Sequence, residues 1–114
     1  MFGLFSGSSG GQVKSAGPRD VAGRLAEFKV VDVREPAELV GDLGRIQEAV
    51  NVPLATVRAK AEAWDRGQKI LVVCRSGGRS GAAAAELARM GFTDVTNLSG
   101  GMMAWASSGL PVVR

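Results

Sequence analysis

Residues 70–80 constrain the fold of this chain more than any other segment. Four apolar residues at 70–73 (ILVV) are typical of a strand buried within a parallel sheet. They run directly into the loop 74–80 (CRSGGRS), and the alanine-rich segment 81–90 then predicts a helix. A strand, a short loop and a helix in this order are typical of an α/β protein with a parallel sheet.

The loop holds the only cysteine of the chain, Cys74, with Arg75 and Arg79 close by. We expect its thiol at the carboxyl end of the strand, facing the amino terminus of the next helix. Free cysteine has a pKa of about 8.5, and helix N-termini and cations lower it to about 3.5–7.5. The sequence therefore predicts an exposed, ionised nucleophile. The alternative is a buried core thiol, which is common for cysteine.

The chain contains one cysteine and no histidine. This composition excludes an internal disulfide, a zinc site with two cysteines, and any catalytic dyad or metal site that needs histidine. If Cys74 is a nucleophile, its activation must come from backbone amides, the helix dipole and arginine. We predict no metal and no cofactor, and a lone thiol fits a reducing compartment.

Short apolar strands alternate with helical segments along the rest of the chain, which predicts a parallel sheet with helices on both faces. Gly91 and Phe92 predict a Schellman-type end for the helix at 81–90. Further strands are predicted at 12–15, 29–33, 49–52 and 94–98, and further helices at 18–26, 37–40, 54–66 and after the glycine pair 100–101.

A length of 114 residues fits one domain, which we place at 12–114. Residues 6–11 are all serine or glycine, so residues 1–11 are expected to form a flexible tail. Residues 1–5 are too short for a signal sequence, and no stretch reaches the length of a membrane helix. We therefore expect a cytoplasmic protein.

The net charge is +3 and the sequence pI is about 9.6. This charge belongs either to a mildly basic solvated surface or to a field that favours a small anionic substrate. No run of lysine and arginine and no aromatic platform supports nucleic-acid binding. We expect a small anionic ligand, no nucleic acid, no membrane partner and a monomeric state.

Four segments together resemble the rhodanese-like sulfurtransferase domain. The segment 32–38 (DVREPAE) is similar to the family's DVRxxxE motif, and 44–53 (GRIQEAVNVP) to its GHIPGAxNIP motif. The loop 74–80 matches the CRSGxRS type, and 98–105 (LSGGMMAW) resembles the terminal LxGGxxxW motif. Two positions depart from these motifs: Arg45 stands where the family often has histidine, and Glu48 where it usually has glycine.

The resemblance implies a five-stranded parallel sheet with helices on both faces and a site beyond the carboxyl ends of the strands. It further implies that the Cys74 thiolate attacks the outer sulfur of a donor such as thiosulfate and forms a persulfide. A second nucleophile, cyanide or a small or protein thiol, then removes that sulfur.

The other loop residues have two interpretations each. Gly77 and Gly78, with Ser76, let the amides turn inward as an anion nest around the sulfur. Arg75 and Arg79 either bind the donor or lie on the surface, where Arg79 can pair with Glu35 or Glu38. Ser76 either contributes to binding or caps the helix. Ser80 is expected to cap the helix and is also a supporting candidate for the site.

Asp32 and Arg34 are expected to form an ion pair that orders the strand end. Arg34 is long enough to approach Cys74. We therefore also count Arg34, with its partner Asp32, as supporting candidates for the site.

Other functions compete with sulfur transfer. Cysteine-dependent phosphatases and arsenate reductases place one residue more between cysteine and arginine than the four that separate Cys74 from Arg79. A non-catalytic module that binds partners or senses redox state usually lacks the cysteine. A sulfur carrier that serves a dedicated protein partner is not separable from a free-standing sulfurtransferase by sequence.

Overall fold

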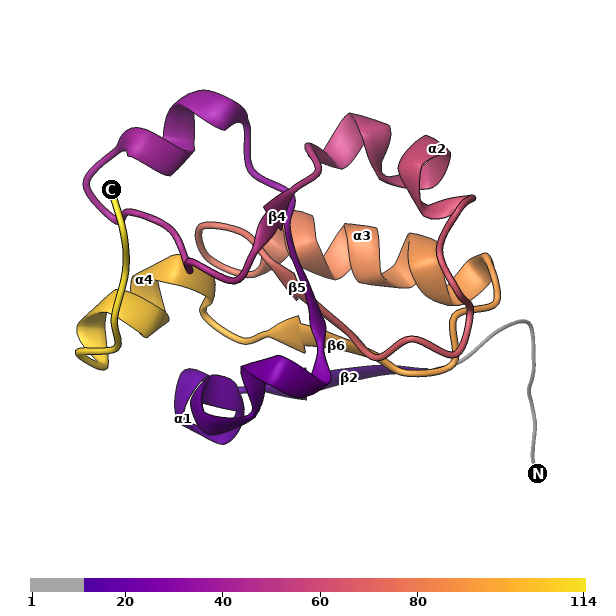
Figure 1. Ribbon diagram of the computed structural model, residues 1–114, viewed down its shortest axis with the longest axis horizontal. Coiled ribbons are helices and arrows are strands. Elements are labelled where there is room, and N and C mark those ends of the chain that lie inside the picture. The colour runs from indigo at the N-terminus through magenta and orange to yellow at the C-terminus, as the bar shows by residue number, and fades with distance from the viewer. Residues whose placement is uncertain (1–11) are drawn as a thin grey trace.

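The computed structural model describes residues 12–114, so the tail predicted at 1–11 lies outside the described residues. Within that range, five parallel strands form one sheet in the order β2-β6-β5-β3-β4 (Figure 1). The strands are β2 (Val13–Ala16), β3 (Lys29–Asp32), β4 (Val50–Asn51), β5 (Ile70–Val73) and β6 (Val95–Leu98). Because β5 is the central strand, its carboxyl end places Cys74 between the ends of β3 and β6.

Helices cover both faces of this sheet, which confirms the predicted α/β class. Helices α1 and α4 lie on one face, and α2 and α3 on the other (Figure 1). The helical segments are α1 (Pro18–Val21), η1 (Ala22–Glu27), η2 (Pro36–Val40), η3 (Leu54–Thr56), α2 (Val57–Ala61), α3 (Gly78–Arg89) and α4 (Gly101–Ser107). None of the helices within residues 12–114 is long and apolar enough to span a membrane.

Strand β5 is buried on both faces because its side chains alternate between two cores. Ile70 and Val72 belong to the core under α2 and α3, whereas Leu71 and Val73 belong to the core under α1 and α4. All four side chains are fully buried, which explains why the run contains no polar residue. The same alternation directs the next side chain, Cys74, toward α3.

The prediction of one continuous helix at 18–26 is wrong. An α-helical turn, α1, is followed by the 3₁₀ segment η1, and Arg24 has non-helical dihedral angles (φ −126°, ψ 17°). Val21, Leu25 and Phe28 nevertheless pack on the same core, as their spacing predicts. The spacing of these apolar residues therefore reflects their contact with the core on the sheet, and it does not require a continuous helix.

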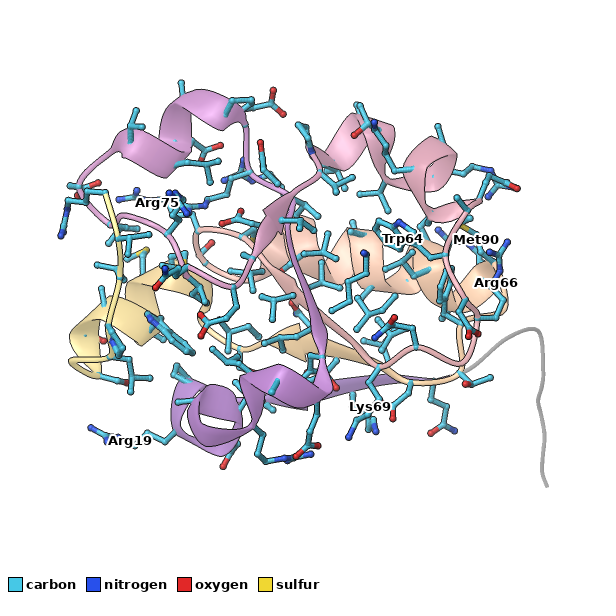
Figure 2. The ribbon with its side chains drawn as sticks, viewed as in Figure 1. Arg19, Trp64, Arg66, Lys69, Arg75 and Met90 are labelled. Atoms are coloured by element: carbon cyan, nitrogen blue, oxygen red, sulfur yellow. The ribbon has the colours of Figure 1, made fainter. Side chains whose placement is uncertain are left out.

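The helix predicted at 54–66 is also shorter than expected, because α2 ends at Ala61. The Arg66 side chain folds back and donates hydrogen bonds to the carbonyls of Ala61 and Trp64, at 3.1 and 3.0 Å. It also bonds the carbonyl of Met90 at the end of α3, at 3.1 Å, and Figure 2 shows these side chains at the same end of the molecule. The Arg66 side chain thus donates hydrogen bonds to carbonyls that would accept from backbone N–H groups in a longer helix.

The remaining boundaries differ by a few residues. Helix α3 begins at Gly78, three residues before the predicted start at 81, and β4 covers only the middle of the predicted strand 49–52. The Schellman end of α3 is confirmed, since Phe92 N–H donates to Leu87 C=O at 3.1 Å and Gly91 N–H to Ala88 C=O at 3.0 Å.

Candidate active site

The candidate site is the short loop between β5 and α3. Cys74 follows directly on β5, and the N-cap of α3 is Gly77, which has a positive φ of 108°. The turn is therefore completed within a few residues, and the amino terminus of the 12-residue helix α3 lies beside the cysteine. This is the arrangement of strand, loop and helix that the sequence predicts.

The carbonyl groups of Cys74 and Arg75 point toward α4. Met102 N–H donates to Cys74 C=O at 2.8 Å, and Met103 N–H donates to Arg75 C=O at 3.0 Å. In a trans peptide the C=O and the following N–H point in opposite directions. The N–H of Ser76 is therefore directed away from α4, toward the side on which the Cys74 sulfur lies.

Gly101 makes this contact between α4 and the loop possible. It has a φ of +56°, and a Cβ atom at this position would lie 2.4 Å from Cys74 O and 2.6 Å from Arg75 O. A side chain here would separate α4 from the loop. The sequence predicts a tight turn at the glycine pair 100–101, but not that the second glycine lies against the cysteine.

Polar groups surround the sulfur of Cys74. Gly77 N–H donates to Sγ at 3.1 Å, and the Ser80 hydroxyl lies 3.3 Å from it. Burial raises the pKa of the thiol, but hydrogen bonds from the Ser80 side chain and from the amides of Ser80, Gly77 and Ser76 lower it by more. The net effect is a pKa below the ordinary value of a cysteine, reached without an imidazole.

The expectation that Cys74 is exposed is wrong, because only 1% of the residue is accessible. Its side chain continues the alternation of β5 into the core under α3, where it packs in the same cluster as Val72, Ala83 and Ala84. The alternative, a thiol buried in the core, is therefore correct as regards the location of the side chain. The inward amide and hydroxyl groups distinguish this thiol from an ordinary core cysteine.

Arg79 is paired with Glu38 of η2. Two hydrogen bonds of 2.7 and 2.9 Å join its guanidinium to the Glu38 carboxylate. The hydrogen bond from Arg79 lowers the pKa of Glu38 to about 2, and Glu38 in turn raises the pKa of Arg79. The structure thus shows the ion pair that is one of the two sequence interpretations, with the Arg79 side chain 38% exposed.

Arg75 lies in a more open position. Its guanidinium is 3.8 Å from the Asp42 carboxylate, and about half of its side chain is exposed. Figure 2 shows Arg75 at the end of the molecule where η2 lies. Two arginines therefore border the loop, Arg79 held by Glu38 and Arg75 only weakly engaged.

Asp32 and Arg34 form the expected ion pair at the end of β3. Both side chains are 1% exposed, and Arg34 Nη2 lies 2.8 Å from Asp32 Oδ2. The guanidinium also donates to the carbonyls of Gly44 and Glu38, at 2.9 and 3.4 Å. These bonds direct Arg34 into the η2 region, and among the described residues none joins it to the cysteine loop.

Neither serine caps α3, so the cap predicted for Ser80 is wrong and the cap alternative for Ser76 is excluded. Ser76 is exposed, and no side-chain hydrogen bond caps the helix, whose N-cap is Gly77. Ser80 lies in the first turn and is fully buried, and its hydroxyl donates to Asn97 Oδ1 at 2.5 Å while also approaching Cys74. A helix that starts at Gly78 rather than 81 turns Ser80 inward.

Asn97 is a residue of the site that the sequence analysis missed. It lies on β6, and its side-chain Nδ2 donates to Gly77 C=O at 3.1 Å. The register pairs Asn97 with Val72 on β5, two residues before the cysteine. An amide residue inside the strand 95–98 (VTNL), next to the central strand, is the signal that would have identified it.

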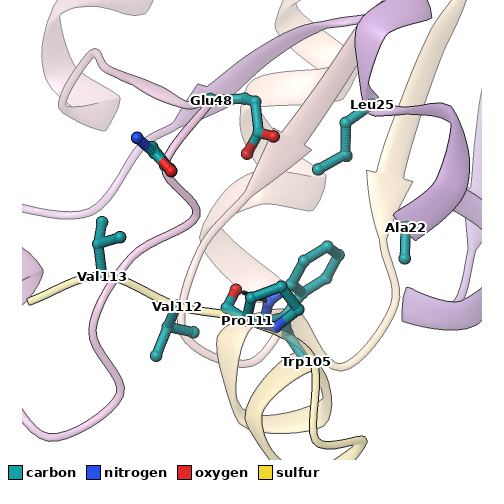
Figure 3. Close-up of a pocket in the computed structure, with 8 residues that line it drawn as sticks. Ala22, Leu25, Glu48, Trp105, Pro111, Val112 and Val113 are labelled. Atoms are coloured by element: carbon teal, nitrogen blue, oxygen red, sulfur yellow. Dashed lines mark hydrogen bonds between the residues drawn. The ribbon is translucent and has the colours of Figure 1, made fainter.

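A separate pocket of about 140 Å³ lies on the other face of the sheet (Figure 3). Glu48 and Leu25 face it from one side and Trp105 and Pro111 from the other. No residue of the loop 74–80 lines it. Within residues 12–114 no group of three or more cysteine or acidic side chains is arranged to hold a metal ion.

These features define a class of α/β protein in which a loop at the carboxyl edge of a parallel sheet surrounds a single cysteine with backbone amides. The family model that describes the rhodanese-like domain matches residues 18–108. The chain belongs to this family, as its motifs indicated.

Relatives and solved structures agree with this assignment. A protein of Allochromatium vinosum named sulfurtransferase is 38% identical over a 93-residue alignment, which covers 79% of this chain and 85% of that protein. Thiosulfate sulfurtransferase 16 of Arabidopsis thaliana is 35% identical over 99 residues, covering 76% and 81% of the two chains. The crystal structure of a rhodanese-related protein from Thermoplasma volcanium has a TM-score of 0.79 at 35% identity, covering 88% and 97%.

Proposed function

We propose that this protein is a sulfurtransferase that moves sulfane sulfur from a donor such as thiosulfate to a thiophilic acceptor through a persulfide at Cys74. The observation that carries the proposal is the Gly77 amide 3.1 Å from the only sulfur nucleophile of the chain. Membership of the rhodanese-like family and the names of the two relatives support the same reaction class.

The first step is attack of the Cys74 thiolate on the outer sulfur of thiosulfate. A new S–S bond forms to Sγ, the S–S bond of thiosulfate breaks, and sulfite leaves with the electron pair. The negative charge then lies on the outer sulfur of the persulfide, where the inward amides of the loop stabilise it. Soft sulfur nucleophiles suit this kind of covalent catalysis.

The second step returns the enzyme to its starting state. Cyanide or a thiolate attacks the outer sulfur, the persulfide S–S bond breaks, and Cys74 leaves as a thiolate. With cyanide the product is thiocyanate, so atoms and charge balance over the cycle. No proton transfer is required in either step, which fits a site without histidine.

Arg75 and Arg79 are proposed to bind the anionic part of the donor. Arg79 has to leave Glu38 to do so, and the donor also needs access to a sulfur that is buried in the resting structure. We therefore propose that donor binding exchanges the Glu38 carboxylate for the sulfonate of thiosulfate. The cytoplasmic location and the monomeric state expected from the sequence stay predictions.

Intact-mass measurement tests the proposal. Incubation with thiosulfate should add one sulfur atom to the protein, and cyanide should remove it with release of thiocyanate. The Cys74→Ser variant is the control and should gain no mass. Full turnover by Cys74→Ser, or hydrolysis of a phosphate ester by the wild type, would contradict the proposal. A stable mass increase with negligible turnover to cyanide would indicate a sulfur carrier instead.

A further inference from the structure

The hydroxyl of Ser80 lies between two acceptors. Its Oγ is 2.5 Å from Asn97 Oδ1 and 3.3 Å from Cys74 Sγ. A hydroxyl has one proton to donate, so it serves one of these acceptors at a time. Ser80 is fully buried, which limits its partners to the groups that the fold places around it.

The side chain of Asn97 is held in one orientation. Its Nδ2 donates to Gly77 C=O at 3.1 Å, so the atom that faces Ser80 is the oxygen, which can only accept. The first turn of α3 lies close to this amide, since a Cβ atom at Gly81 would be 3.4 Å from Nδ2. Asn97 therefore presents a fixed acceptor to the Ser80 proton.

We propose that Asn97 is a positioning residue that competes with the Cys74 sulfur for the proton of the Ser80 hydroxyl. While Cys74 is a neutral thiol, the Ser80 hydroxyl donates its proton to Asn97 Oδ1. The Ser80 oxygen is then free to accept a hydrogen bond from the S–H group of Cys74. When the thiol proton leaves to solvent, the hydroxyl turns to the anionic sulfur. This inference rests on the proposed function and deepens it, because it names the residue that sets how readily the nucleophile ionises.

The competition predicts the sign of each substitution. Removing the Asn97 oxygen leaves the sulfur as the acceptor for Ser80, so the thiolate is favoured and the pKa of Cys74 falls. Removing the Ser80 hydroxyl takes a donor from the thiolate, so the pKa rises. The alternative is that Asn97 acts only by holding the Gly77 carbonyl. Its loss would then loosen the loop amides and raise the pKa of Cys74, whether or not the Ser80 hydroxyl is present.

The charged groups near Cys74 stay the same in these variants. Arg75 lies in the loop beside Asp42, and Arg79 lies in the first turn of α3, bound to Glu38 of η2. On β3, Asp32 is bound to Arg34. None of these side chains bonds Ser80 or Asn97, so changes at residues 80 and 97 report on the hydroxyl rather than on an ion pair.

The test is titration of the thiolate by its ultraviolet absorbance. The chain has one cysteine and no tyrosine, so the signal belongs to Cys74, and Cys74→Ala supplies the blank. The variants are Asn97→Ala, Asn97→Val, Ser80→Ala and the double variant Ser80→Ala/Asn97→Ala. Thr96→Val is the matched control, because the neighbouring residue on β6 faces the other side of the sheet.

We expect the midpoint to fall by about 0.5–1 pH unit when Asn97 is replaced and to rise by a similar amount in Ser80→Ala. Asn97→Ala should change nothing in the Ser80→Ala background, and Thr96→Val should match the wild type. A rise or no change in the Asn97 variants, or an equal change in both backgrounds, would overturn the proposal. Circular dichroism decides which Asn97 variant is folded, and if neither folds, the residue is structural and the proposal fails.

The titration is independent of sulfur transfer. Absorbance reports only the ionisation of Cys74, whereas the mass increase with thiosulfate reports persulfide formation. A wrong sign in the Asn97 variants would therefore leave the proposed reaction standing. A missing mass increase would leave the titration fully interpretable.

Discussion

The backbone N–H of Met102 lies 2.8 Å from the carbonyl oxygen of Cys74, which fastens the first turn of α4 to the loop that carries the sulfur. The segment 98–105 is thus part of the site, although it is distant from the loop in sequence. Helix α4 binds the carbonyls of Cys74 and Arg75. The N–H groups of the same peptides point in the opposite direction, toward the side on which the sulfur lies. This contact explains why the first residue of α4, Gly101, is a glycine.

Gly101→Ala should separate these two segments. The new Cβ would lie 2.4 Å from Cys74 O at a φ of +56°, so the backbone has to move. We expect the free energy of unfolding to fall by about 2–4 kcal/mol, from steric conflict and the left-handed backbone together. Urea denaturation measures this loss, and sulfur transfer by the folded fraction should also fall.

Gly109→Ala is the matched control for that experiment. Gly109 has a φ of +75°, but a Cβ atom added there would have no other atom within 4 Å, so only the left-handed cost of about 1–2 kcal/mol applies. Transfer activity of this variant should be normal. Equal losses of stability in the two variants would show that the contact between α4 and the loop contributes little.

The fold could be predicted from the sequence because its signals are local. The unbroken apolar run at 70–73 marks a strand covered on both faces, and Gly91 with Phe92 marks the end of α3. The pattern at 54–66 predicts too long a helix, because the fold-back of Arg66 onto carbonyls of α2 and α3 is a tertiary contact. A helical pattern does not show where such a contact ends the helix.

The inner part of the site could be predicted only in outline. The inward amides follow from a strand, a glycine loop and a helix, and the structure contains the Gly77 bond to sulfur. Cys74 is buried because its side chain continues the alternation of β5 into the core under α3. The role of Ser80 depends on the residue at which α3 starts. Asn97 comes from a neighbouring strand, so only the register of the sheet brings it to the loop.

Arg79→Ala should weaken the use of thiosulfate more than it weakens folding. The side chain is partly exposed and its ion pair with Glu38 stabilises the fold little, whereas a charged hydrogen bond to a bound anion is worth roughly 10- to 100-fold in rate. Steady-state kinetics and thermal unfolding measure the two effects. Equal proportional losses would assign Arg79 to structure alone.

A second variant separates loss of the cation from release of Glu38. Arg79→Ala leaves the Glu38 carboxylate unpaired, and a free negative charge also repels the donor. The double variant Arg79→Ala/Glu38→Gln removes both charges. If the double variant recovers the wild-type rate, Arg79 only neutralises Glu38, and its proposed contact with the donor is wrong.

Glu38→Gln should change both donor binding and acid stability. It frees Arg79, so the KM for thiosulfate should fall. In the folded state the pKa of Glu38 is held at about 2, below its ordinary value, by the hydrogen bond from Arg79. The pair therefore stabilises the protein at pH values above the ordinary pKa, and this contribution disappears as the pH falls toward 2.

The acid effect is measured as the difference in unfolding free energy between wild type and Glu38→Gln. Because the pair is partly exposed, we expect at most about 1 kcal/mol at neutral pH, shrinking on acidification. Glu27→Gln is the control, since the pKa of Glu27 is also lowered to about 2, by Arg24 and Lys69. It should show the same trend with an unchanged KM. A KM that rises in Glu38→Gln would mean that the carboxylate positions Arg79 rather than competing with the donor.

Arg34→Met should destabilise the protein strongly without changing the chemistry at Cys74. Both members of the Asp32–Arg34 pair are buried, so removing the guanidinium leaves a carboxylate without its counter-ion, at a cost of about 3–5 kcal/mol. The double variant Asp32→Asn/Arg34→Met removes the uncompensated charge and should recover much of the loss in urea unfolding. Since the bonds of Arg34 go to β3 and the η2 region, turnover per folded molecule should equal that of the wild type. A specific fall in turnover, with stability restored in the double variant, would place Arg34 in the site after all.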